Sequence, residues 1–242
     1  MEPLVHTFDE RGYTARSCQI GHMKCVEIPS LKLLVAVGGH GKAQFAVQSQ
    51  YLIDRCPDAS ALICVGAAGR LAHHLTCGDV VVATSTIEHD YRLRFISRPP
   101  PVHQPDPALL ATLREVSASR SFRFRVHFGI VASGDEDIID PVRAEEVRLA
   151  TGALAVAWEG SGGARAAHFN GLDFMEVRVI TDAAGEAAAH EFHENLKMVM
   201  PNATELLLEW ASRGGSGEGA GIATAPSPKN CACNVRRTQL KH

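Results

Sequence analysis

Residues 173–182 read DFMEVRVITD, a run of mostly β-branched and other apolar residues that ends on a carboxylate. The polar corner Asn170-Gly171 precedes the run, and the small residues at 183–185 follow it. This pattern predicts a buried strand that ends in a loop. Ligands of open α/β sheets bind at the carboxyl ends of strands, so Asp182 is a candidate for chemistry.

Asp182 has a second interpretation, because Asp is also a preferred N-cap for a helix formed by the residues that follow. Two features favour a functional site. Arg178 lies four residues earlier, so strand alternation places it on the same face as Asp182, where it can pair with a carboxylate. The apolar run ALAVAWE at 153–159 also ends on an acid, Glu159, and leads into small residues. Two predicted strands that end on carboxylates indicate a site.

Residues 155–186, AVAWEGSGGARAAHFNGLDFMEVRVITDAAGE, resemble the C-terminal half of the nucleoside phosphorylase superfamily, most closely its methylthioadenosine/S-adenosylhomocysteine nucleosidase branch. That branch has Met-Glu where this chain has Trp158-Glu159. Its second strand ends Arg-x-x-Ser-Asp, and the matching residues here are Arg178, Thr181 and Asp182. The similarity extends more loosely from about residue 30 to about residue 210.

The resemblance implies an α/β fold over residues 1–212, a single-domain three-layer sandwich with a central mixed β-sheet flanked by helices. The family opens with a buried strand and an Ala-Met-x-x-Glu motif whose glutamate activates the attacking water. This chain opens with MEPLV, so the first family strand is expected to be missing, with catalytic activity impaired as a result. Glu2 is the candidate for the water-activating acid, and an exposed terminal acid is the alternative. Residues 213–242 are rich in Gly, Ser and Pro and are predicted to form a disordered tail.

Composition narrows the classes of function. The chain has 242 residues, with 24 basic against 27 acidic side chains, so no basic surface for nucleic acid or an anionic membrane is expected. Seven scattered cysteines, no signal peptide and no membrane-length apolar run predict a cytoplasmic protein without disulfides. His190 and His193 have no third ligand at a suitable spacing, so they are interpreted as the start of a surface helix. We expect no metal and no cofactor.

The remaining segments alternate between strand and helix patterns. A hairpin is predicted at 23–28 and 31–38, and the glycine-rich turn at 38–42 is assigned to packing. Further strands are expected at 59–66, from residue 80 and at 124–132, helices from residue 43 and at 107–119 and 194–210, and a loop at 89–107.

Two turns carry the rest of the expected site by resemblance. In the nucleosidases, backbone groups of the turn that here includes Ala68 and Gly69 line the purine and ribose. Phosphorylases bind phosphate with an arginine and a Ser/Thr at the positions of Cys64 and Ala67, which have no side chains suited to phosphate, so water is the implied nucleophile. Ile138 is expected to read the base edge through its backbone.

Three functions remain open. The first is hydrolysis of the N-glycosidic bond of an adenine-type nucleoside such as methylthioadenosine or S-adenosylhomocysteine. Here Asp182 protonates the base, Glu159 binds the ribose hydroxyls, Arg178 orients the acid, and Trp158 and Thr181 help to bind the substrate. The second is a phosphorylase of the same fold. The third is a non-catalytic nucleoside-binding or scaffold protein, to which Trp158 and the acid Asp137, in place of the family's stacking aromatic, lend weight. A small-molecule nucleoside and a second copy of the chain, as a homodimer, are the expected partners.

Overall fold

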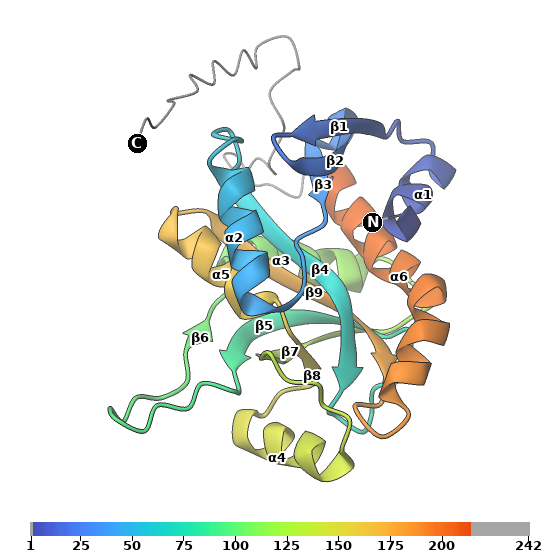
Figure 1. Cartoon of the computed structure of the whole chain (residues 1–242). Coiled ribbons are helices and arrows are strands. Elements are labelled where there is room, and N and C mark those ends of the chain that lie inside the picture. Colours follow the sequence, from blue (N-terminus) through green and yellow to red (C-terminus); the bar gives the residue numbers. More distant parts are fainter. Residues whose placement is uncertain (1, 214–242) are drawn as a thin grey trace, which may run out of the picture.

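The computed structural model describes residues 2–213, so nearly all of the predicted tail lies outside the described residues. Two sheets and the helices around them make up this part of the chain (Figure 1). The strands are β1 (Arg16–Ile20), β2 (Met23–Ile28), β3 (Leu33–Ala36), β4 (Ala61–Arg70), β5 (Val80–Glu88), β6 (Val102–His103), β7 (Val126–Ser133), β8 (Ala155–Ala157) and β9 (Asp173–Asp182). The α-helices are α1 (Glu2–Glu10), α2 (Gly41–Ile53), α3 (Pro107–Ser119), α4 (Pro141–Thr151), α5 (Gly160–Phe169) and α6 (Ala188–Ser212).

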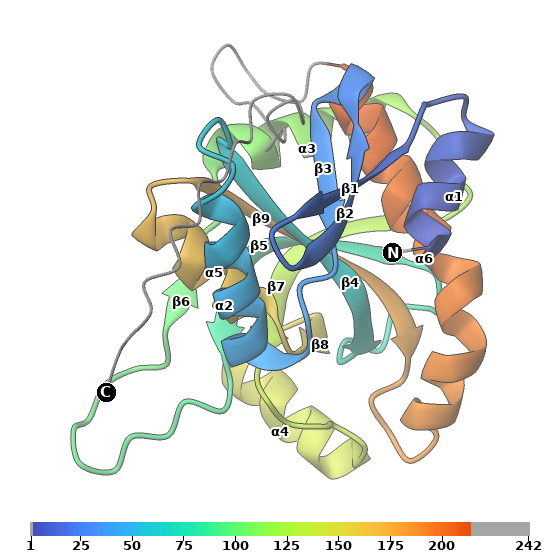
Figure 2. The same cartoon turned by 45° about the horizontal axis from the view of Figure 1, so that its top comes forward.

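The smaller sheet is an antiparallel meander in the order β1-β2-β3 (Figure 2). It confirms the predicted hairpin, whose turn is the 3₁₀ segment Pro29–Leu31 followed by the left-handed residue Lys32, at φ 53°. Strand β1 was not predicted, because its sequence RSCQI is short and largely exposed and has no apolar face for a pattern to reveal.

The larger sheet is mixed, as predicted, with the order β6-β5-β7-β8-β4-β9. Strand β9 pairs parallel with β4 and also antiparallel with β5 through Val177–Val179, so the sheet curls back on itself. The central position of β9 explains its composition, since every residue from Phe174 to Thr181 is buried. Strand β9, which has the clearest strand pattern in the sequence, therefore closes the sheet by pairing with both β4 and β5.

Helices cover both faces of β4 and β9, which gives the predicted three layers (Figure 1). Helices α2 and α5 pack on one face, while α6 packs on the other and is itself covered by α1 and α3. Helix α3 has the predicted bounds, because the Asp106 side chain caps the amides of Ala108 and Leu109. Helix α6 begins at Ala188, six residues earlier than expected.

Strands β3 and β4 each have one side that lacks a strand partner over most of its length. Strand β3 pairs with β2 alone, and β4 pairs with β8 only at Gly69 and Arg70. Among residues 2–213, no strand lies between these two edges. The cavity of the site is lined by β3 together with Val37, and by most residues of β4 from Ala61 to Gly69.

Candidate functional site

The site is built where β4 and β9 end side by side. Gly69 pairs with Asp182, after a register shift in β4 between Ala68 and Gly69. A Cβ atom at Gly69 would lie 2.8 Å from Asp182 Oδ1, so only glycine leaves room for the carboxyl group there. Ala68 and Gly69, predicted from a turn, and Asp182, predicted from a strand end, are thus brought together.

Asp182 is held by its immediate neighbours in the chain. Thr181 Oγ1 donates a hydrogen bond to Asp182 Oδ2 at 2.8 Å, and the amide of Ala184 donates to Oδ1 at 3.0 Å. Ala184 has a left-handed backbone, φ 48°, which is uncommon for a residue with a Cβ. The alternative role of Asp182 as a helix N-cap is wrong, because α6 starts later and is preceded by Ala187.

Burial raises the pKa of Asp182 above the ordinary Asp value, and the negative charge of Glu191 adds to this effect. The hydrogen bonds from Thr181 and Ala184 act in the opposite direction but do not cancel the rise. A carboxyl group with a raised pKa keeps its proton to higher pH, which is the state that a proton donor needs.

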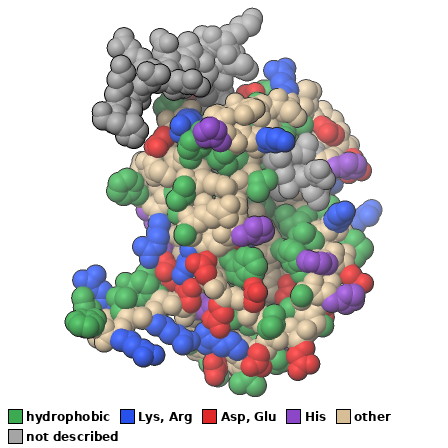
Figure 3. All heavy atoms as spheres, in the orientation of Figure 1, with side chains coloured by type: hydrophobic (Ala, Val, Ile, Leu, Met, Phe, Trp, Pro, Cys, Tyr) green, Lys and Arg blue, Asp and Glu red, His purple; other side chains and the backbone are tan. Residues whose placement is uncertain are grey.

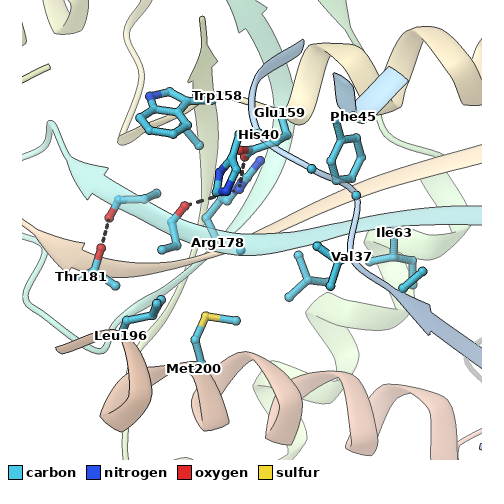
Figure 4. Close-up of a pocket in the computed structure, with 18 of the residues that line it drawn as sticks. Val37, His40, Phe45, Ile63, Trp158, Glu159, Arg178, Thr181, Leu196 and Met200 are labelled. Atoms are coloured by element: carbon cyan, nitrogen blue, oxygen red, sulfur yellow. Dashed lines mark hydrogen bonds and ion pairs between the residues drawn. The ribbon is translucent and has the colours of Figure 1, made fainter. Parts of the chain in front are cut away.

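A charged triad comprises Glu159, Glu176 and Arg178, of which Glu176 and Arg178 are buried and Glu159 is half-buried. Arg178 Nη1 donates to Glu159 Oε2 at 3.0 Å (Figure 4). Arg178 Nε donates to Glu176 Oε1 at 2.7 Å. Glu176 is fully buried and also accepts a hydrogen bond from Thr86. Burial alone would lower the pKa of Arg178, but Cys64 and the two glutamates raise it, so Arg178 stays charged.

This triad differs from the expectation that Arg178 orients Asp182. Both side chains line the cavity, as strand alternation predicted. However, Glu176 lies two residues before Arg178 on the same face of β9, so it takes the hydrogen bond at close range. Arg178 therefore orients Glu159, which begins the turn into α5, where the positive end of the helix dipole also favours a carboxylate.

Asp182, Glu159 and Arg178 all line one cavity of about 680 Å³. Eight of the nine residues predicted for the site line it: Ala68, Gly69, Ile138, Trp158, Glu159, Arg178, Thr181 and Asp182. The ninth, Glu2, is the first residue of α1, and its role stays a prediction.

Other wall residues were missed from the sequence. His40, in the turn that was assigned to packing, lines the cavity, and its ring centroid lies 6.1 Å from that of Trp158 in an edge-to-face arrangement (Figure 4). A lone histidine among glycines before a helix was the available signal. Asp137 also lines the cavity, so an acid is present where the family resemblance expected an aromatic. Apolar side chains such as Phe45 and Met200 complete the walls.

Two further kinds of feature, a metal-binding cluster and a membrane-spanning helix, are absent from the described residues. Across residues 2–213, no three or more His, Cys, Asp or Glu side chains gather in a way that would hold a metal ion. Within the same range, no helix has the length and apolar character needed to cross a lipid bilayer.

Comparisons with known proteins agree with this geometry. Residues 2–212 match the family described as the Phosphorylase superfamily. The 5'-methylthioadenosine/S-adenosylhomocysteine nucleosidase of Bacillus subtilis (strain 168) is 30% identical over 224 residues, which cover 88% of this chain and 96% of that protein.

Solved structures show the same fold. The 5'-methylthioadenosine/S-adenosylhomocysteine nucleosidase of Neisseria meningitidis, in complex with methylthio-immucillin-A, superposes with a TM-score of 0.77 at 24% identity, covering 88% of this chain and 96% of that one. The futalosine hydrolase of Helicobacter pylori gives a TM-score of 0.77 at 22% identity, covering 88% and 94% of the two chains.

Proposed function

Because the chain belongs to the phosphorylase superfamily, we propose that it hydrolyses the N-glycosidic bond of an adenine-type nucleoside and releases the free base. The proposed substrates are methylthioadenosine, S-adenosylhomocysteine or another adenosine with a 5' substituent. One observation carries the proposal: a carboxyl group with a raised pKa, Asp182, and a carboxylate fixed by a buried arginine, Glu159, line the same cavity.

Each group has a defined part in this reaction. Adenine leaves slowly as an anion, and protonation of a ring nitrogen by Asp182 makes it a neutral leaving group. As the bond breaks, positive charge develops on the ribosyl group, and the Glu159 carboxylate stabilises that charge while accepting hydrogen bonds from the ribose hydroxyls. Glu2 remains the proposed base for the attacking water.

Two features favour water over phosphate as the nucleophile. Cys64 is completely buried, and its Sγ accepts a hydrogen bond from Arg178 Nη2 at 3.3 Å, so this position offers no cation to a phosphate. Ala67, at the second position, has no side-chain donor. We also propose, from the family resemblance, that the protein acts as a homodimer in the cytoplasm.

The test is incubation with a panel of purine nucleosides, with and without phosphate, followed by detection of free base. We expect release of adenine from 5'-substituted adenosines in the absence of phosphate. An absolute requirement for phosphate would instead identify a phosphorylase. Ligand binding without release of base would identify a non-catalytic binding protein, the role that Asp137 in the cavity wall favours.

A further inference from the structure

Asp182 separates two cavities. One is the large cavity that contains Glu159 and Arg178, and the other is a hollow of about 370 Å³ whose remaining lining residues differ from those of the large cavity. Thr181 and Asp182 line both. We call this second cavity the rear hollow; its other walls include Arg70, His73, Cys77 and Glu191. The exposed His73 and Cys77 place it at the protein surface.

Glu191, in the first turn of α6, holds the backbone that orients Asp182. Its Oε2 atom accepts a hydrogen bond from the amide of Ala183 at 2.9 Å. The next amide, that of Ala184, is the donor to Asp182 Oδ1. One turn further along α6, Asn195 Nδ2 donates to the carbonyl oxygen of Thr181 at 2.9 Å. Helix α6 therefore clamps the backbone on both sides of Asp182.

Such a clamp explains how the left-handed Ala184 is maintained. This backbone is strained for a non-glycine residue, so it persists only where surrounding contacts fix it. The hydrogen bond of Glu191 to the preceding amide is such a contact.

Charge gives Glu191 a second effect. Its carboxylate contributes to the raised pKa of Asp182, because a nearby negative charge disfavours ionisation of the Asp182 carboxyl group. The other charged or titratable groups that line the two cavities include Arg70, His73 and Cys77 in the rear hollow, and His40, Glu136, Asp137, Glu159, Arg178 and His193 in the large cavity. Glu191 lies in the rear hollow, so its charge acts on Asp182 without occupying the substrate cavity.

We propose that Glu191 is a positioning residue for the acid: it holds the Ala183 amide, and with it the turn that presents Asp182, and its negative charge favours a protonated Asp182, which gives up that proton as the bond to the base breaks. This inference rests on the proposed function. In the reaction, Asp182 gives one proton to the base nitrogen as the N-glycosidic bond breaks. The attacking water forms the new C–O bond and gives one proton to the proposed base Glu2, which passes it to solvent, and Asp182 then regains one from solvent, so protons balance over the cycle.

The test compares Glu191→Gln with Glu191→Ala. Gln retains an oxygen that can accept the Ala183 hydrogen bond but carries no charge, whereas Ala removes both. For Glu191→Gln we expect the alkaline limb of the kcat–pH profile to move to lower pH, with KM and the plateau at lower pH unchanged. Glu191→Ala should show the same movement together with a lower plateau. Glu194→Gln, an exposed acid one turn away on α6, is the matched control and should match the wild type.

A second readout does not depend on catalysis. The titration of the Asp182 carboxyl carbon, followed by NMR in protein labelled with ¹³C-aspartate and assigned with Asp182→Asn, should move to lower pH in Glu191→Gln. An unchanged Asp182 titration in that variant would overturn the inference, even if the enzyme acts as proposed. A moved titration in a protein that releases no base would support the role of Glu191 and reject the proposed reaction.

Discussion

At the scale of single residues, Asp182 is the side chain on which the proposed reaction depends most. Replacement by Asn keeps the size of the side chain and an oxygen that accepts the Ala184 hydrogen bond, but removes the proton to be donated. We expect Asp182→Asn to lower turnover about a hundredfold or more, with an unchanged melting temperature. Rates of base release and thermal unfolding curves give both values.

The control for this variant is Asp173→Asn, the same substitution at the other end of β9. It should leave turnover unchanged. A near-normal rate in Asp182→Asn would remove Asp182 from the role of general acid.

Glu88, at the end of β5, is expected to stabilise the fold through its ionised carboxyl group. Burial alone would raise its pKa, but the His103 ring, with Nε2 3.7 Å from Glu88 Oε1, the hydrogen bonds from Arg165, and the charges of Arg165 and Lys42 lower that pKa to about 2. A carboxyl group with a lowered folded-state pKa stabilises the fold above its unfolded pKa, and this contribution is lost as pH falls toward the folded value. Glu88→Gln should therefore reduce the free energy of unfolding at neutral pH by an amount on the order of 3 kcal/mol.

Urea unfolding between pH 2 and pH 7 checks this expectation. The difference between Glu88→Gln and the wild type should shrink as pH falls below about 4.5. A constant difference across that range would show that the lost stability comes from packing rather than from ionisation.

Single residues also show where sequence reasoning stopped. Asp182, Glu159 and Arg178 were predictable because strand ends and strand alternation are visible in the sequence. The role of Glu176 was not, since its partner Thr86 lies 90 residues earlier and reaches it only through the fold. His40 was missed for the same reason, because the turn that carries it faces the site only after β3 and β4 are placed.

At the scale of elements, the open edges of β3 and β4 lead to a test with an added strand. Two unpaired strand edges that line one apolar cavity leave backbone donors and acceptors without strand partners. A chain extended upstream by an apolar strand and an Ala-Met-x-x-Glu motif should therefore melt at a higher temperature and turn over about a hundredfold faster.

The assay compares the extended and the present chain side by side. A matched extension in which the motif glutamate is replaced by glutamine should keep the gain in melting temperature and lose the gain in rate. Equal rates for the extended and present chains, or high activity of the present chain that Glu2→Gln abolishes, would identify Glu2 as the working base instead.

Most elements were predictable, and the errors have physical causes. Strands β4, β5, β7 and β9 and helix α3 have strong apolar patterns and clear boundaries, and all were expected. Strand β6 is a two-residue pairing with the edge of β5 inside a proline-rich loop, which no local pattern reveals. The second pairing of β9, with β5, is a tertiary property, so the closure of the sheet was not visible in the sequence.

At the scale of the whole molecule, acidic and basic side chains are interspersed on the face shown in Figure 3, and no large basic patch stands out there. The segment between β5 and β6 projects from the body of the protein (Figures 1 and 2). It exposes Leu93, Phe95 and Ile96, with Phe95 fully exposed. Exposed apolar side chains that lie close together mark interaction sites.

We therefore expect the proposed homodimer to use this segment. Phe95→Glu combined with Ile96→Glu should shift the protein toward monomer in sedimentation velocity at micromolar concentration. The control is Phe169→Glu, an equally drastic change at an exposed position at the end of α5, which should leave the distribution unchanged. A wild-type protein that sediments as a monomer would contradict the prediction.

The net charge of the triad Glu159, Glu176 and Arg178 also has a consequence for the reaction. Glu159 and Glu176 bring two negative charges into the interior, and Arg178 supplies a single positive one. These three residues therefore carry one negative charge in excess. A neutral nucleoside does not offset that charge, whereas a ribosyl cation does, so under the proposed function these three residues are electrically balanced only while the bond is breaking.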